Sequence, residues 1–225
     1  MRPSRQQVND LIDEHRFLPL FNPDSLEVTQ RVLKAAYEGG VRLFELTNRS
    51  KNALEIFQQV FPFVQKQLPG LVLGAGTIMD ETSARAFYEA GAAFIVSPVI
   101  PAQVARYCEG NHICWVPGAS TLNEIVHAHQ LGADMVKIFP ANYLGGPGFV
   151  EAIKAPCPWI KVMPTGGVEG SEENLRAWFK AGVRCVGIGS HLFRKEKIAA
   201  GNFNSIREET QRITGIIQHI KSSLA

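Results

Sequence analysis

Short apolar runs alternate with longer amphipathic stretches along the chain. Four stretches share one pattern, in which a helical segment passes through glycine into an apolar run: AAYEGGVRLFEL, AFYEAGAAFIVS, AHQLGADMVKIF and WFKAGVRCVGIG. Glycine readily adopts the left-handed conformation that ends a helix, and a near-continuous apolar run is typical of a strand covered on both faces. The pattern therefore predicts four helix–strand units.

Four further apolar runs, at 17–21, 71–75, 113–116 and 159–163, bring the expected strands to eight. The segments between them have helical patterns, the clearest at 25–37, 52–67, 81–89, 122–129 and 172–179. An amphipathic segment at 4–14 should cap the N-terminal end of the strands, and a helix at 204–222 should close the chain. Short connections favour a single TIM-type (β/α)8 barrel with an extra N-terminal helix, although an open doubly wound sheet fits the same strand count.

Composition narrows the class of protein. The 225 residues are enough for one domain, 1–225, and 45% of them are hydrophobic. The net charge of +2 comes from scattered acids and bases, which argues against a nucleic-acid partner. The first ten residues lack the apolar stretch of a signal peptide, no apolar run approaches membrane-spanning length, and the four cysteines contain no C-x-x-C pair. We expect a soluble, cytoplasmic protein with reduced cysteines and no membrane partner.

Polar residues occur where the expected strands end. Read in chain order, they are Asn22, Glu45, Thr47, Arg49, Thr77, Ser97, Ser120, Lys137, Thr165 and Ser190. Barrel enzymes assemble their sites from the carboxyl ends of their parallel strands. We therefore expect these side chains to lie on one rim.

Lys137 interrupts the apolar strand in ADMVKIFPA. Burial disfavours the charged ammonium, lowers the pKa of a lysine and frees the lone pair that attacks a carbonyl. The alternative is a lysine whose head group reaches solvent at the end of the strand. Glu45 and Arg49 in FELTNRS should approach the same rim, where Arg49 can bind a carboxylate and Glu45 can exchange protons. Even spacing also allows a purely structural ion pair between Glu45 and Arg49.

Glycine-rich turns follow the last two expected strands. Gly166 and Gly167 lie in MPTGGVEGSEEN before a helix start, and Gly189 and Ser190 lie in CVGIGSHLF. Free backbone amides and a helix N-terminus can bind an anion, and barrels often bind phosphate at this place. Simple tight turns are the alternative. The histidines have no ligand-spaced carboxylates, so we expect no metal site.

The chain closely resembles the bacterial aldolases for 2-keto-3-deoxy-6-phosphogluconate (KDPG) and 4-hydroxy-2-oxoglutarate (KHG). The resemblance rests on segments that cover almost the whole chain in order: VRLFELTNRS, GAGTIMD, FIVSPVI, VPGAST, VKIFPAN, MPTGGV and VGIGSHLF. K-x-F-P and P-T-G-G are the most specific of these motifs. The resemblance implies a homotrimer of barrels, a Schiff-base lyase with pyruvate as product or donor, and no metal or organic cofactor.

Roles carry over from this resemblance residue by residue. Lys137 would form the Schiff base and Glu45 would be the general acid and base. The remaining residues would bind substrate, with Arg49, Thr77 and Thr165 at the pyruvate carboxylate, Pro98 and Phe139 as walls, and Gly166, Gly167 and Ser190 at a phosphate. The chain departs from the usual family pattern at Val99, Leu122, Asn142 and His191, all of which concern the aldehyde end of the substrate.

The sequence thus predicts a metal-independent aldolase that cleaves KDPG reversibly to pyruvate and glyceraldehyde 3-phosphate. The same chemistry on KHG, giving pyruvate and glyoxylate, is the first alternative. A sugar-phosphate isomerase or epimerase could use the same barrel and phosphate turns, but it would need no imine-forming lysine. A non-catalytic phosphosugar-binding protein is a third alternative, and it would leave Lys137, Glu45 and Arg49 as an unexplained cost in stability.

Overall fold

Helices and strands alternate along residues 2–224, which the computed structural model describes. The strands are β1 (Phe17–Phe21), β2 (Leu43–Thr47), β3 (Val72–Gly76), β4 (Phe94–Val96), β5 (Cys114–Val116), β6 (Gly118–Ala119), β7 (Val136–Ile138), β8 (Val162–Pro164) and β9 (Val186–Ile188). The helices are α1 (Arg5–His15), α2 (Leu26–Glu38), α3 (Ala53–Gln67), α4 (Glu81–Glu89), α5 (Ala102–Gly110), α6 (Leu122–Gln130), the 3-10 helix η1 (Ala141–Leu144), α7 (Pro147–Lys154), α8 (Glu172–Lys180), α9 (Lys195–Ala199) and α10 (Phe203–Leu224). This order confirms the predicted α/β class.

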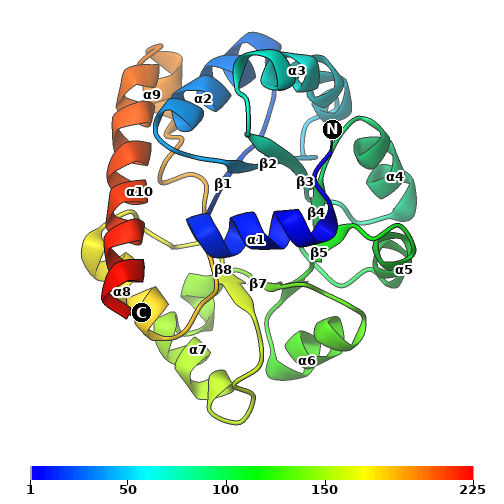
Figure 1. The fold of residues 1–225 in the computed structure, drawn as a ribbon, viewed down its shortest axis with the longest axis vertical. Coiled ribbons are helices and arrows are strands. Elements are labelled where there is room, and N and C mark those ends of the chain that lie inside the picture. The colour runs from blue at the N-terminus through cyan, green and yellow to red at the C-terminus, as the bar shows by residue number, and fades with distance from the viewer. Residues whose placement is uncertain (1, 225) are drawn as a thin grey trace.

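The strands form two sheets in which every pairing is parallel. The larger has the order β5-β4-β3-β2-β1-β9, and the smaller has the order β6-β7-β8. Pro117 separates β5 from β6, since proline has no N–H to continue a ladder. A single bridge between Thr165 and Gly187 joins the end of β8 to β9. Figure 1 shows the helices arranged around these strands, with α1 across the middle.

Three expected strands differ from their predicted bounds, and the run at 71–75 shifts by only one residue, to Val72–Gly76. The apolar run at 159–163 becomes a strand only at Val162, because Trp159 lies in the loop after α7, where its side chain is 53% exposed. The run at 113–116 begins its strand at Cys114, and the chain resumes pairing after Pro117. Helices α5, α7 and α9 had not been singled out from the sequence. The serine expected to start a helix, Ser171, is the N-cap of α8 and accepts a hydrogen bond from Asn174 N.

Alternate strand residues face opposite sides of the sheets. One set, including Phe44, Leu46, Val136 and Ile138, packs outward against the surrounding helices. The other set packs inward beneath α1 and includes Leu18, Leu43, Phe94, Met135 and Met163 together with Val8 and Ile12 of α1. As the sequence predicted, the N-terminal helix therefore covers the N-terminal end of the strands.

A polar network centred on Asp134 holds α1 in this place. The Asp134 carboxylate accepts hydrogen bonds from Arg5 Nε at 2.9 Å, Asn9 Nδ2 at 2.7 Å and Trp115 N at 3.1 Å. Arg184 donates to Asn9 Oδ1 at 2.7 Å from the start of β9. The N-terminal helix is thus tied to the strands by directional bonds as well as by apolar packing.

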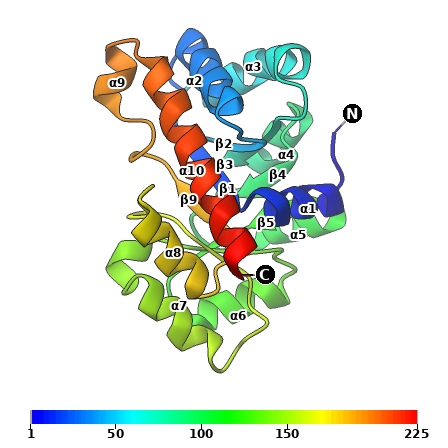
Figure 2. The ribbon, with the colours of Figure 1, turned by 60° about the vertical axis from the view of Figure 1, so that its left-hand side comes forward.

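The C-terminal helix α10 packs against α2 and α8 (Figure 2). Its apolar face buries Ile206, Ile213, Ile217 and Ile220, while charged residues lie on its other face. Among the helices of residues 2–224, none is both long enough and apolar enough to cross a membrane.

Candidate active site

Strands β2 and β7 each direct one ionisable side chain inward. Phe44 and Leu46 of β2 face the helices, so Glu45 between them faces the enclosed side of the sheet. The same alternation turns Lys137 of β7 inward, since Val136 and Ile138 on either side of it face outward. Both side chains are removed from water, with Glu45 0% and Lys137 3% exposed.

The two side chains meet. Lys137 Nζ lies 3.7 Å from Glu45 Oε1, within ion-pair range but beyond ordinary hydrogen-bond length. Neither carboxylate oxygen of Glu45 accepts a hydrogen bond from another residue within 2–224. A molecule bound against Lys137 would therefore find a carboxylate with free lone pairs beside it, which is what proton transfer requires.

The environment of Lys137 lowers its pKa. Burial is the main cause, the Glu45 carboxylate opposes it, and the Arg49 guanidinium adds to it. The Phe139 ring lies 5.5 Å from Nζ and forms an apolar wall beside the amine. The direction of the pKa shift agrees with the sequence argument, and it increases the share of neutral, nucleophilic amine near neutral pH.

Lys154 is a second lysine whose surroundings change its pKa. Burial lowers the pKa of Lys154 as well. Its Nζ donates to the carbonyl oxygens of Pro158 at 3.3 Å and Ile160 at 3.1 Å, in the loop after α7. A lowered pKa alone thus does not distinguish Lys137, whereas its inward position beside Glu45 does.

Arg49 and Thr77 form a second pair at the ends of β2 and β3. Arg49 Nε donates to Thr77 Oγ1 at 3.1 Å, and Thr77 has a φ of 60°, which is uncommon for a β-branched residue. Glu45 pairs with Lys137, and among the described residues it forms no ion pair with Arg49. Backbone strain of this kind concentrates at binding sites, and the exposed guanidinium can still bind a carboxylate.

Thr165 and Pro98 border the same enclosed space. Thr165 Oγ1 is buried without a hydrogen-bond partner among residues 2–224, and a methyl group on Gly187 would overlap it. A methyl group on Gly118 would lie 3.0 Å from Pro98 Cα and closer to its carbonyl group. Because Gly118 pairs with Lys137 in the ladder, Pro98 lies along the wall next to the lysine strand.

The two glycine turns leave neighbouring strands. Gly166 and Gly167 have φ values of 88° and 80°, which favour glycine, and both are half-buried. Gly189 is half-buried and Ser190 is exposed. Within residues 2–224, the N–H groups of Gly167 and Ser190 donate no hydrogen bond to another main-chain group. The turns can therefore offer free donors to an anion.

One residue expected on the rim does not lie there. Since Phe94 and Val96 face inward, Ser97 faces outward, where it is buried and accepts a hydrogen bond from Trp115 Nε1 at 3.2 Å. Two other hydroxyl groups expected on the rim donate hydrogen bonds within the protein. Ser120 Oγ donates to Phe139 O at 2.9 Å, and Thr47 Oγ1 donates to Asn22 Oδ1 at 3.1 Å.

Gly76 is a site residue that the sequence reasoning missed. A methyl group on Gly76 would lie 2.5 Å from Glu45 Cδ and 2.7 Å from Cγ, and closer still to Oε1. The absence of a side chain at the end of β3 is thus what gives the Glu45 carboxylate its place. The two glycines of GAGTIMD, spaced to face one side of a strand, were the available signal.

Other reactive side chains do not gather elsewhere in the described chain. Within residues 2–224, no group of three His, Cys, Asp or Glu side chains is placed to hold a metal ion. Cys108, Cys114 and Cys185 are buried free thiols, and burial raises the pKa of Cys108 to about 12. These cysteines are therefore poor nucleophiles.

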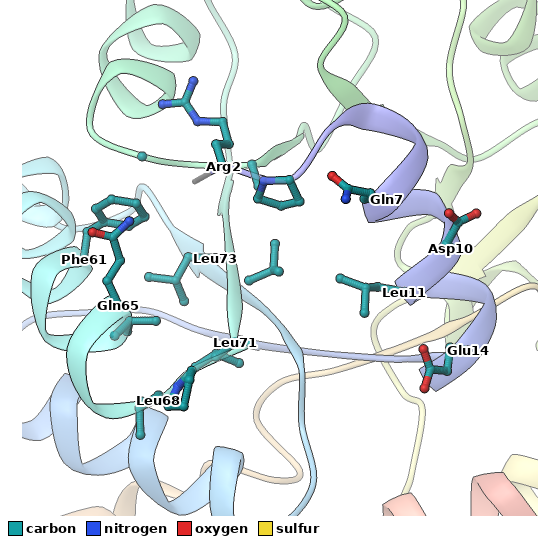
Figure 3. A pocket seen from close by; sticks show the side chains of 17 residues that line it. Arg2, Gln7, Asp10, Leu11, Glu14, Phe61, Gln65, Leu68, Leu71 and Leu73 are labelled. Carbon is teal, nitrogen blue, oxygen red and sulfur yellow. The ribbon is translucent and has the colours of Figure 1, made fainter.

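A cavity of about 810 Å³ lies away from Lys137 and Glu45 (Figure 3). It is bounded by α1, by the end of α3 and by Val72 and Leu73 at the start of β3. Because Thr77 follows the other end of β3, this cavity opens at the N-terminal end of the strands, opposite the Lys137 rim. Its lining combines apolar residues such as Leu11 and Phe61 with exposed polar ones.

Comparison with known proteins gives concordant results. The family model described as KDPG and KHG aldolase matches residues 8–209. The "KHG/KDPG aldolase" of Escherichia coli (strain K12) is 30% identical over 207 residues, covering 92% of this chain and 94% of its own. The "2-dehydro-3-deoxy-phosphogluconate aldolase" of Treponema pallidum is 29% identical over 214 residues, covering 93% and 99%. The crystal structure of Legionella pneumophila KDPG aldolase, with pyruvate captured as a covalent carbinolamine, matches with a TM-score of 0.83 at 26% identity and covers 92% and 98%.

Proposed function

The chain belongs to the KDPG and KHG aldolase family, and we propose that it cleaves KDPG reversibly into pyruvate and glyceraldehyde 3-phosphate through an imine on Lys137. The observation that carries the mechanism is the buried Lys137 amine, 3.7 Å from the Glu45 carboxylate. The relatives of this chain are named as aldolases for the same compound. The enzyme is accordingly a carbon–carbon lyase.

The reaction follows from these two groups. The neutral amine of Lys137 attacks the C2 carbonyl of the keto acid, and loss of water gives an iminium ion. Glu45 takes the proton of the C4 hydroxyl as the C3–C4 bond breaks, the aldehyde leaves, and the bonding electrons move into the iminium ion to form an enamine. Glu45 returns the proton to C3, and water then releases pyruvate and restores the amine.

We assign the two ends of the substrate to the two groups of polar residues. Arg49, Thr77 and Thr165 bind the pyruvate carboxylate, which places the carbonyl group beside Lys137. Pro98 and Phe139 form the walls. The distal phosphate lies against the turns that contain Gly166, Gly167, Gly189 and Ser190, whose free N–H groups support this assignment.

We also propose that the two sheets work as one closed eight-stranded barrel, with β5 and β6 as halves of one strand. The bridge between Thr165 and Gly187 supports this closure.

We further propose that 1–225 is one domain, of which residues 1 and 225 lie outside the described part. A cytoplasmic homotrimer without metal or organic cofactor remains our prediction, and light scattering of the purified protein tests the trimer.

A second candidate function is cleavage of KHG to pyruvate and glyoxylate. The relative in Escherichia coli, 30% identical to this chain, is named for both substrates. The same imine and proton transfers would serve, because KHG differs from KDPG beyond C4. Comparing kcat/KM for the two substrates decides between them.

Borohydride trapping tests the mechanism. Incubation with pyruvate and borohydride should attach one pyruvate-derived group to the protein, and peptide mapping should locate it at Lys137. Lys137→Met should abolish both trapping and cleavage, while Lys154→Met, at the other lysine whose burial lowers its pKa, should retain both. Trapping of the wild-type protein at another lysine, or cleavage by the Lys137→Met variant, would contradict the mechanism.

A further inference from the structure

Asn22 follows β1 and lies on the inner face of the larger sheet. Leu18 of β1 packs inward, and strand alternation gives Leu20 and Asn22 the same direction. Leu20 pairs with Glu45 of β2, and on its other side a methyl group on Gly189 would lie 3.2 Å from Leu20 Cγ. Asn22 is the next inward residue after Leu20, so it lies between β2 and the glycine turn that follows β9.

A buried hydroxyl group fixes the Asn22 carboxamide. Thr47 lies two residues beyond Glu45 on the same face of β2 and is 0% exposed, and its Oγ1 donates to Asn22 Oδ1 at 3.1 Å. Within residues 2–224, the Asn22 side chain makes no other hydrogen bond. Since Thr47 holds the oxygen, Nδ2 is turned away from Thr47 and keeps two free N–H donors. The half-buried Asn22 thus presents an oriented donor on the inner face.

The proposed substrate passes this donor. The mechanism places the C4 hydroxyl group of KDPG at Glu45 and its phosphate, on C6, at Gly189 and Ser190. Asn22 lies about 6.6 Å further along the sheet than the paired Leu20 and Glu45, at about 3.3 Å for each strand residue. The part of KDPG between those two ends is C5 with its hydroxyl group. A neutral amide can donate to that hydroxyl oxygen, and this leaves the Glu45 carboxylate free for proton transfer.

We propose that Asn22 is a specificity-determining residue whose amide donates a hydrogen bond to the C5 hydroxyl group of the substrate, and that Thr47 is the positioning residue that orients this amide. This inference rests on the proposed function. It deepens that function by naming the side chain that recognises the hydroxyl group next to the aldehyde carbon of the departing fragment.

The test compares cleavage of KDPG with cleavage of 5-deoxy-KDPG, which lacks only the C5 hydroxyl group, by measuring pyruvate release. Loss of one neutral hydrogen bond should lower kcat/KM for KDPG about three- to tenfold in Asn22→Ala and should change little for 5-deoxy-KDPG. The ratio of the two kcat/KM values should therefore fall by about threefold or more. Thr47→Val keeps the shape but removes the orienting O–H, so the ratio should fall there too. Because Thr47 acts through Asn22, the double variant should have the same ratio as Asn22→Ala.

Asn52→Ala is the matched control, because it removes an exposed carboxamide that bonds to Asp24 O at 3.4 Å in the loop after β1. Its ratio should stay within about twofold of wild type. A smaller than threefold fall in Asn22→Ala, the same fall in Asn52→Ala, or a further fall in the double variant overturns the inference. Each of these results leaves the proposed function standing if the wild-type protein traps pyruvate and cleaves KDPG. Wild-type protein that does neither overturns both.

Discussion

Gly76→Ala is the perturbation that most directly tests how the Glu45 carboxylate is placed. The added methyl group would lie 2.5 Å from Glu45 Cδ, so that carbon would have to retreat by about 0.9 Å to reach an ordinary contact of 3.4 Å. The backbone of β3 cannot easily give way, because it pairs with β2 along its whole length. The carboxylate must therefore leave its position beside Lys137.

Two magnitudes follow from this displacement. Overpacking a buried site costs about 1–3 kcal/mol of stability, which urea unfolding can measure. Misplacing a catalytic group by about 1 Å can cost about 10²-fold in rate, so kcat for KDPG cleavage should fall by about that factor. Both effects should appear together in the same variant.

The pH dependence gives a readout that a purely structural defect would not change. Glu45 opposes the lowering of the Lys137 pKa, so moving the carboxylate away should lower that pKa further. The pH at which pyruvate trapping is half-maximal should therefore shift downward in Gly76→Ala. Trapping is measured by mass spectrometry at saturating pyruvate across the pH range.

Gly74→Ala is the matched control in the same strand. A methyl group there would overlap the Phe94 ring in the inward apolar layer, and its three nearest atoms would all belong to that ring. It should destabilise the protein by a similar amount while keeping the wild-type trapping profile. Wild-type turnover and pH profile in Gly76→Ala, or the same downward shift in Gly74→Ala, would refute the reasoning.

Three further predictions concern other parts of the structure. Glu45→Gln keeps the shape but removes the base, so KDPG turnover should fall by about 10²–10⁴-fold; a steady-state assay showing wild-type turnover would exclude the role. Arg49 helps to lower the Lys137 pKa, so that pKa should rise in Arg49→Gln. Pyruvate trapping at saturating pyruvate should then shift to higher pH. An unchanged pH profile would show that Arg49 does not influence the Lys137 pKa. Asp134→Ala leaves Arg5 without its 2.9 Å partner and should cost about 2–4 kcal/mol in urea unfolding, with pyruvate trapping retained. A loss below about 0.5 kcal/mol would show that the Asp134 carboxylate contributes little to holding α1.

The sequence by itself determined the α/β class and singled out the buried Lys137. A helix that ends at glycine and an apolar run that follows are local patterns, because they reflect backbone conformation and side-chain period within one segment. Lys137 was visible for a similar reason, since a charge inside an apolar strand is costly unless its environment is special. Glu45 and Arg49 followed from their places at a strand end.

Only the tertiary structure decided how these residues meet. The 3.7 Å approach of Lys137 to Glu45, the outward direction of Ser97 and the break at Pro117 depend on register and strand parity. Close packing between segments far apart in the chain decided two further contacts. It placed the Glu45 carboxylate against Gly76 and the Asn142 side chain against Gly167. Such contacts depend on how many residues from different segments pack together, so a local sequence pattern does not predict them.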